Sequence, residues 1–129
     1  MKTSVGVDIV RISRVREIAE RRGERFLGRY FTKDEVEYSR RKSDPYPHLA
    51  ARFAAKEAAF KAFSAAGVHG LPLSSFEVVV GDRGVPAIRD SGRAPRRFTS
   101  DNIAVSLSHD GDLAIAAVVL SGDISVTNR

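Results

Sequence analysis

Apolar and polar residues alternate near both ends of the chain, with the period of two that a strand with one buried face requires. Within the first twelve residues, Val5, Val7 and Ile9 occupy every second position. Later, two apolar runs flank Asp110-Gly111, a pair typical of hairpin turns. The expected strands cover Met1–Ile12, Phe76–Val80, Val85–Arg89, Ile103–Ser108 and Leu113–Leu120.

The middle of the chain changes to the helical period. His48–Ala66 is rich in alanine, the best helix former, and contains neither Gly nor Pro, so it predicts one long helix. Its apolar stripe consists of Leu49, Phe53, Phe60 and Phe63. We expect Phe53 and Phe60 to anchor this helix against the sheet.

Two shorter helices precede the long one. Ser13 is a suitable N-cap for a helix to about Arg22, which either ends at Gly23 or continues towards Tyr30. A Thr32-x-x-Glu35 capping box predicts the second, over Lys33 to about Arg41.

Helices early in the chain and strands late favour an α+β fold. The expected architecture is an antiparallel β-sheet packed against one long helix with additional short helices, in one domain over residues 1–129. Residues 90–102 are polar, contain a proline and allow a short helix. The tail after Ser121 is expected to be loose.

Composition excludes several classes of protein. The 129 residues include no cysteine, which rules out disulfides and cysteine-ligated zinc. No segment resembles a signal peptide, and no apolar run approaches the ~18 residues of a membrane span. A cytoplasmic setting is therefore expected.

The net charge of +5 lies in one segment. Arg11–Lys42 holds eleven basic and six acidic residues, whereas the rest of the chain is balanced. Such a patch suits an acidic partner: nucleic acid, an anionic membrane or an acidic protein. If the first helix runs on through Gly23, Arg14, Arg21 and Arg25 project within about 40° of each other.

Charged residues also stand beside the apolar stripe of the long helix. Lys56 points into the stripe and is expected to snorkel along the sheet edge, while Glu57 and Lys61 lie on its flank one turn apart. Asp8 is the one charge in the apolar run VGVDIV, where an unpaired carboxylate would be expensive to bury. Two carboxylates from different elements, with an amine nearby, suit a Mg²⁺-phosphate site. The alternatives are a strand-end cap for Asp8 and a surface ion pair for Glu57–Lys61.

The remaining polar motifs are less specific. His109 precedes Asp110 and Asp112 in a sequence that is good hairpin-turn chemistry rather than a metal loop. His48 and His69 have no partners at metal-ligand spacing. The phosphate-binding glycine motifs and the G-x-S-x-G elbow are absent, so any nucleotide would be bound in another way.

Three segments together resemble the holo-[acyl-carrier-protein] synthases, the small type of 4′-phosphopantetheinyl transferase. They are GVDIVRI (Gly6–Ile12), RFAAKEAAFKAF (Arg52–Phe63) and VSLSHDGDLAIAAVV (Val105–Val119). Their order and separation fit the family, and the resemblance spans nearly the whole chain.

The resemblance implies transfer of the phosphopantetheine arm of coenzyme A to a serine of apo acyl carrier protein, with release of adenosine 3′,5′-bisphosphate. By the same resemblance, Asp8 and Glu57 hold Mg²⁺ against the pyrophosphate. Lys61 contacts the phosphates. Two candidates remain for the base that takes the serine proton: Glu57, directly or through a water, and Lys61.

The resemblance also implies a nucleotide site and an assembly. Arg52 and His109 are expected to contact the 3′-phosphate of coenzyme A, and the Gly84-x-Pro86 loop its adenine side. The family forms trimers with each site between subunits, so His109 of a neighbouring chain would face Asp8 and Glu57. Because acyl carrier proteins are acidic, the basic segment Arg11–Lys42 of this chain is expected to dock one. The docking residues would be Arg14, Arg21 and Arg25.

Two other functions deserve comparison. A nucleic-acid-binding domain would explain the basic segment, but aromatic content is 8% and no RNA-binding strand motif is present. A Mg²⁺-dependent phosphohydrolase would use the same acids. The transferase hypothesis accounts for more of these residues. It implies neither nucleic acid nor a membrane as partner. It places the protein in fatty acid or polyketide synthesis.

Overall fold

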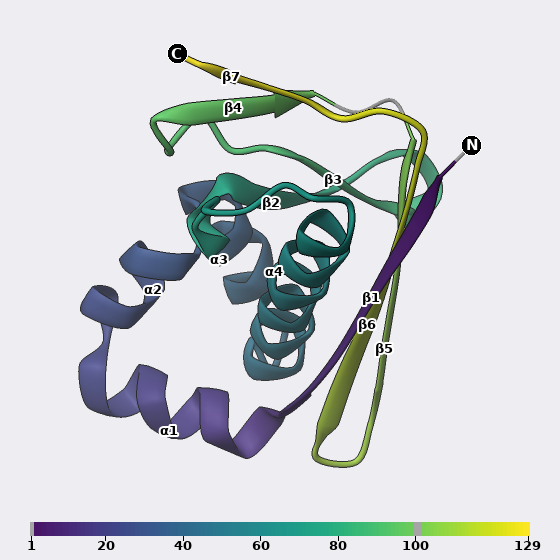
Figure 1. The fold of residues 1–129 in the computed structure, drawn as a ribbon. Helices are drawn as coiled ribbons and strands as arrows, with labels where there is room; N and C mark the ends of the chain where they lie inside the picture. The colour runs from purple at the N-terminus through teal and green to yellow at the C-terminus, as the bar shows by residue number, and fades with distance from the viewer. Residues whose placement is uncertain (1, 100–101) are drawn as a thin grey trace.

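In residues 2–99 and 102–129, the part of the chain that this computed structural model describes, one strand is followed by four helices and then by six strands (Figure 1). Met1, expected to begin the first strand, lies outside this part. The helices are α1 (Ile12–Arg22), α2 (Glu24–Tyr30), α3 (Lys33–Arg40) and α4 (Tyr46–Ala65), and single 3₁₀ turns are η1 (Leu73–Ser75) and η2 (Asp82–Gly84). The strands are β1 (Thr3–Arg11), β2 (Phe76–Val80), β3 (Pro86–Asp90), β4 (Arg96–Thr99), β5 (Ile103–Asp110), β6 (Leu113–Ser121) and β7 (Ser125–Asn128).

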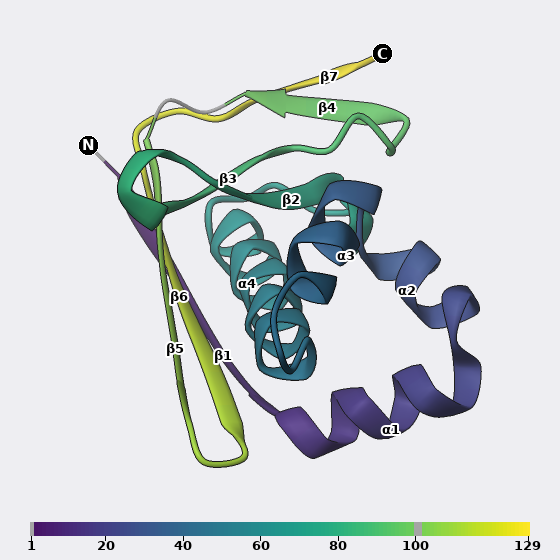
Figure 2. The ribbon, with the colours of Figure 1, turned by 180° about the vertical axis from the view of Figure 1, so that it is seen from behind.

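Helix α4 lies at the centre of the fold, with a sheet on one side and the shorter helices on the other (Figures 1 and 2). The sheet has the order β1-β6-β5 and is antiparallel throughout. The two-stranded pairs β2-β3 and β4-β7 lie across one end of α4. The expected α+β fold, with an antiparallel sheet packed on one long helix, is confirmed. No helix of the described residues is both long enough and apolar enough to cross a membrane.

The sheet is apolar on both faces. On β6, Ala114, Ala116, Val118 and Leu120 point inward and are buried, as the alternation predicts. On β1, however, the large apolar side chains point outward, with 59% of Val5 exposed. The outward apolar residues of the two strands are Val5, Val7, Ile9, Leu113, Ile115 and Val119, at 39–59% exposed.

The surface of α4 that meets the sheet and the helices is made mainly of alanine. Six alanines of α4 are completely buried, so backbones approach closely from several sides. Phe63 meets the core as expected, but Phe60 is 38% exposed, so its role as an anchor is wrong. Phe53 packs on the rings of Phe26 and Tyr30 in α2 rather than on the sheet, with centroids 6.2 and 5.5 Å away. The sequence did not reveal these contacts because alanine makes most of them, and alanine is too small to stand out as an apolar stripe.

Lys56 and Glu35 form a buried ion pair between α4 and α3. Lys56 Nζ donates to both Glu35 carboxylate oxygens at 2.8 Å and to the carbonyl of Phe76, and neither side chain is exposed. Glu35 also accepts from the Val78 and Thr32 amides at 2.8 Å, completing the expected capping box. Burial lowers the pKa of Lys56, and Glu35 opposes that shift. The expectation that Lys56 snorkels to the sheet edge is wrong, because its charge is satisfied inside the protein.

Two helix ends differ from the expectation. Helix α1 begins at Ile12, and Ser13 does not cap it: the Ser13 amide and hydroxyl instead donate to Asp112, at 2.8 and 2.5 Å. The hairpin turn therefore tethers α1. Gly23, at φ 54°, separates α1 from α2, so the helix does not continue unbroken to Tyr30.

The last third of the chain holds one strand pair that the sequence did not suggest. Residues Arg96–Thr99 form β4 instead of a helix, and Ser125–Asn128 pairs with them as β7 instead of a loose tail. Phe98 of β4 lies in the core, with its ring 5.0 Å from that of Phe63. Packing of this one side chain gives the strand pair a reason to form.

We expect Lys56→Met to lower the free energy of unfolding by about 3–5 kcal/mol, because it leaves the Glu35 carboxylate buried without its cation. The double variant Lys56→Met/Glu35→Gln should recover part of that loss. Urea denaturation of both measures the effect, with Lys33→Met, at an exposed lysine of α3, as the control. A single-variant loss no larger than that of the control would contradict the importance of the pair.

Candidate active site

A close crossing of β1 over α4 creates the first cluster of polar side chains. A Cβ on Gly6 would overlap the carbonyl oxygen of Ala58 and lie 2.9 Å from the Ala62 amide nitrogen, so only glycine permits this approach. Asp8 lies two residues further along β1 and therefore points to the same face. Lys61 Nζ donates to Asp8 Oδ1 at 3.1 Å and to the Val7 carbonyl at 3.0 Å. The glycine thus explains how a strand carboxylate reaches the helix.

Glu57 completes this cluster one turn before Lys61. Partial burial raises its pKa, the negative charge of Asp8 raises it further, and Lys61 opposes both. Lys61 forms its ion pair with Asp8 and acts on Glu57 only at longer range, and its own side chain is half exposed. The cluster is short of positive charge.

These two carboxylates fit a magnesium ion. The described residues hold no group of three or more His, Cys, Asp or Glu that could ligate a metal by themselves. Magnesium is commonly held by only one or two carboxylates, because substrate phosphates and waters supply the other ligands. Asp8 and Glu57 match that arrangement, whereas a structural zinc site would need more protein ligands.

A cleft of about 710 Å³ opens beside Glu57. Its walls come from β1, α1, α2, α4 and β6 and include Val10, Val15, Ile18 and Phe53. One carboxylate in an apolar cleft is consistent with the direction of the Glu57 pKa shift.

A basic groove of about 610 Å³ adjoins this cleft, and Arg14, Ile18, Phe26 and Phe53 line both. Because the helix breaks at Gly23, the three arginines do not form the continuous stripe that one unbroken helix would give. Nevertheless, the fold brings the arginines of α1 and α2 together. The arginines lining the groove are the expected Arg14, Arg21 and Arg25 together with Arg22 and Arg29. Sequence reasoning missed the last two because their direction depends on the kink.

A second polar pocket, of about 200 Å³, gathers the residues expected to bind the nucleotide. Arg52, Gly84, Pro86 and His109 all line it, although they come from α4, η2, β3 and β5. Tyr38 and His48 line it too, although the sequence predicted no role for either. For Tyr38, the one available signal was its place three residues after the capping-box Glu35.

Arg52 is the one permanently charged side chain among the described residues that line this second pocket. The Arg52 side chain is buried, and burial lowers its pKa. Burial likewise lowers the pKa of His48, and the neighbouring charges of Arg52 and Lys42 lower it further. In residues 2–99 and 102–129, no carboxylate pairs with Arg52 and its Nε has no hydrogen-bond partner. An anion would supply what this pocket lacks.

Comparison with known proteins identifies the family. Residues 4–118 match the family model of the 4′-phosphopantetheinyl transferase superfamily. A holo-[acyl-carrier-protein] synthase of Thermodesulfovibrio yellowstonii is 40% identical over 121 residues, covering 94% of this chain and 100% of that relative. The chain belongs to the 4′-phosphopantetheinyl transferase superfamily. The family indicated by the three sequence motifs is confirmed.

Further members of the superfamily agree. A holo-[acyl-carrier-protein] synthase of Geobacter metallireducens is 43% identical over 118 residues, covering 89% of this chain and 94% of the relative. The solved ACPS-CoA complex of Chronobacterium ammoniagenes has a TM-score of 0.74 at 31% identity, covering 93% of this chain and 97% of that one. The Helicobacter pylori holo-[acyl-carrier-protein] synthase in complex with coenzyme A has a TM-score of 0.72 at 28% identity, covering 91% and 99%.

In this transferase the two polar sites are separate within one chain. The cleft beside Glu57 and the pocket around Arg52 share no lining residue. Arg52 and Glu57 lie five residues apart on α4, which turns their side chains about 140° from each other. One chain therefore does not bring His109 to the carboxylate cluster.

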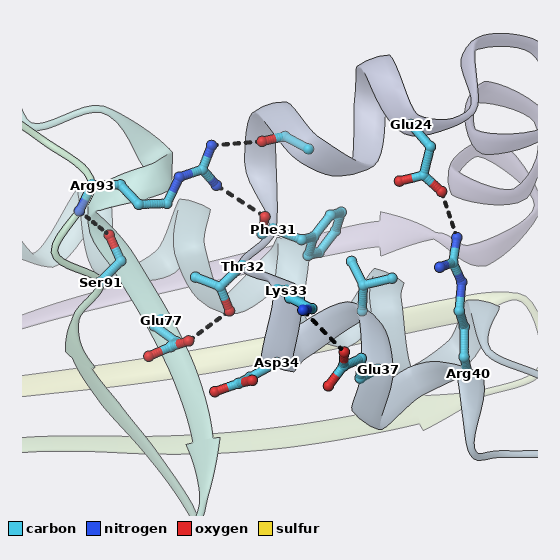
Figure 3. A pocket seen from close by; sticks show the side chains of 12 residues that line it. Glu24, Phe31, Thr32, Lys33, Asp34, Glu37, Arg40, Glu77, Ser91 and Arg93 are labelled. Carbon is cyan, nitrogen blue, oxygen red and sulfur yellow. Dashed lines mark hydrogen bonds and ion pairs between the residues drawn. The ribbon is translucent and has the colours of Figure 1, made fainter.

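Figure 3 shows a further pocket, of about 670 Å³, between α2, α3, β2 and the segment that carries Ser91 and Arg93. Here most charged groups already have partners. Arg93 donates to the carbonyls of Gly28 and Phe31 at 2.6 and 2.9 Å. The side-chain pairs are Arg40–Glu24 at 2.7 Å, Lys33–Glu37 at 4.0 Å and Thr32–Glu77 at 2.6 Å. Because these charged groups already have partners, the pocket presents few free polar groups to a ligand.

We expect Gly6→Ala to lower the free energy of unfolding by about 3 kcal/mol or more, because the added methyl group collides with backbone rather than with a movable side chain. Thermal unfolding measures the loss. Gly28→Ala is the matched control, since nothing lies within 4 Å of the added Cβ in α2. Equal shifts in melting temperature for the two variants would show that β1 does not need its glycine.

Proposed function

We propose that this protein transfers the 4′-phosphopantetheine arm of coenzyme A to a serine hydroxyl of apo acyl carrier protein and releases adenosine 3′,5′-bisphosphate. The observation that carries this proposal is the meeting of Asp8, Glu57 and Lys61 beside an arginine-lined groove. The relatives named holo-[acyl-carrier-protein] synthase, and the similar structures solved with coenzyme A, support it.

The reaction makes one phosphorus–oxygen bond and breaks another. The serine oxygen attacks the β-phosphorus of coenzyme A, and the bond from that phosphorus to the bridging oxygen breaks. The leaving adenosine 3′,5′-bisphosphate carries away the electron pair. The serine proton must pass to a base, and the growing charge on the phosphates must be stabilised.

We assign the proton to Glu57, directly or through a water, and the charge stabilisation to Lys61. When no metal ion is bound there, partial burial and the charge of Asp8 raise the pKa of Glu57. Lys61 donates to Asp8 and to the Val7 carbonyl, which places its Nζ at the edge of the carboxylate cluster. Lys61 as the base remains the rival assignment.

Asp8 and Glu57 are also the residues that would hold Mg²⁺. When bound, the ion would neutralise charge on the pyrophosphate of coenzyme A. Arg52 and His109 would hold the 3′-phosphate, and Gly84 and Pro86 the adenine side, within the second pocket.

We also propose that the protein works as a homotrimer with sites between subunits. The separation of the two polar sites within one chain supports this, since a neighbour could bring its His109 to Asp8 and Glu57. The outer face of β1 and β6 supports it as well, because an exposed apolar face of a sheet is typical of an interface.

The reaction is tested by incubating the protein with coenzyme A, Mg²⁺ and apo acyl carrier protein and measuring the intact mass of the carrier. We expect a gain equal to one phosphopantetheine group, and a rate lowered roughly 100-fold or more in Asp8→Ala and in Glu57→Ala. Asp123→Ala, at an exposed carboxylate away from the cluster, is the control.

Each other outcome favours a named alternative. Free phosphopantetheine without carrier modification would identify a phosphohydrolase. A salt-sensitive shift of DNA or RNA without transfer would identify a nucleic-acid-binding domain. Full activity in both alanine variants would refute the assignment of the carboxylates.

We propose the basic groove as the docking surface for the acidic carrier. Arg14→Glu/Arg21→Glu should raise the KM for carrier protein about ten-fold or more, with the KM for coenzyme A unchanged, because reversed charges repel the partner. Steady-state kinetics at two salt concentrations measure this, and the wild-type KM should itself rise with salt.

The matched control for docking is Lys33→Glu/Arg97→Glu. It changes the net charge by the same amount as Arg14→Glu/Arg21→Glu, but on α3 and β4. Its KM for carrier should stay close to the wild-type value. An equal rise in both double variants would mean that overall charge, rather than the groove, attracts the carrier.

A further inference from the structure

Tyr38 of α3 stands at the centre of three cations. The guanidinium carbon of Arg52 lies 4.3 Å from the centroid of its ring, Lys42 Nζ lies 4.8 Å away, and the guanidinium carbon of Arg41 5.6 Å away. His48 meets the same ring edge to face, with centroids 6.1 Å apart. An aromatic face attracts cations most strongly where water is excluded, and of these cations only Arg52 is buried.

Arg52 has few other contacts to fix its direction. One terminal nitrogen donates to the His48 carbonyl at 3.2 Å, one turn earlier on the same helix. Its Nε has no partner, and no carboxylate in the described part of the chain forms an ion pair with it. The side chain of Tyr38 is therefore the principal contact that α3 makes with this guanidinium, through its ring face and through its hydroxyl.

The position of Tyr38 is itself held firmly. Glu35 and Tyr38 lie one turn apart on α3, and their partners Lys56 and Arg52 lie one turn apart on α4. The buried ion pair and the cation–ring contact thus join the two helices at successive turns. Because the ion pair is fully buried, the cation–ring contact one turn away has little freedom to shift.

We propose that Tyr38 is a positioning residue that orients Arg52 towards the 3′-phosphate and so sets the preference for coenzyme A over 3′-dephospho-coenzyme A. This inference rests on the proposed function. It adds a residue that acts through Arg52 and determines specificity without taking part in the transfer.

The test compares kinetics with coenzyme A and with 3′-dephospho-coenzyme A as alternative substrates. In Tyr38→Leu we expect the KM for coenzyme A to rise about ten-fold, with kcat within about two-fold of wild type. The KM for 3′-dephospho-coenzyme A should not change, because that substrate lacks the group that Arg52 holds. Tyr38→Phe keeps the ring face but removes the hydroxyl that also interacts with Arg52, so the KM for coenzyme A should rise less than in Tyr38→Leu.

The matched control is Tyr46→Leu. Tyr46 also has an arginine over its ring, Arg16 at 5.0 Å, but it does not line the pocket that holds Arg52. Its ratio of kcat/KM values for the two substrates should equal that of wild type. If Tyr38→Leu proves too unstable to purify, Tyr38→Met removes the ring with a more flexible side chain that can adapt to the space, and it carries the same expectation.

A double-mutant cycle tests whether Tyr38 acts through Arg52. In an Arg52→Ala background, Tyr38→Leu should cause no further rise in the KM for coenzyme A. Additive rises, or equal losses with both substrates, would overturn the inference while leaving the transferase function intact. Absence of transfer by the wild-type protein would instead refute the proposed function, so the two failures are distinct.

Discussion

The buried ion pair between Lys56 and Glu35 is the interaction on which the rest of the structure depends. It joins the middle of α4 to the first turn of α3, and through Phe76 and Val78 it also fixes β2. A buried charge pair needs complete hydrogen bonding to be tolerated, and here the capping box supplies part of it. A slip of α3 or β2 would leave one charge unpaired. The pair therefore defines one arrangement of helices and strand more strictly than apolar contacts would.

The absence of a side chain at Gly6 plays the corresponding part on the sheet side. The strand lies against α4 closely enough for Asp8 to reach Lys61, and the helix supplies Glu57 on the same flank. Neither element could bring the two carboxylates together alone. In this arrangement partial burial and the charge of Asp8 raise the pKa of Glu57, and the charge of Lys61 lowers it. Thus α4 is held by an ion pair on one side and by backbone contact on another, and it carries residues of both polar sites.

The sequence predicted what local patterns encode and failed where long-range contacts decide. The capping box, the hairpin and the long helix follow from neighbouring residues, and the motif segments identified Asp8, Glu57 and Lys61 as a group. The helical period directed Lys56 inward, yet nothing nearby marked Glu35 as its partner. Phe60 was predicted to lie in the core because large apolar residues mark a helical stripe, whereas the alanines that are actually buried do not. Strand β7 depends on pairing with β4, more than twenty residues earlier, which no local pattern reveals.

The alanine surface of α4 has a consequence for how this protein can change during evolution. Most residue types on that surface would collide with backbone, and smaller ones are limited to glycine, which weakens a helix. The helix is therefore a poor place to accumulate variation. Change is easier on the arginines of α1 and α2, which are exposed and independent of the packed alanines. The proposed docking arginines can thus diverge among descendants while the residues proposed to bind phosphate stay in place.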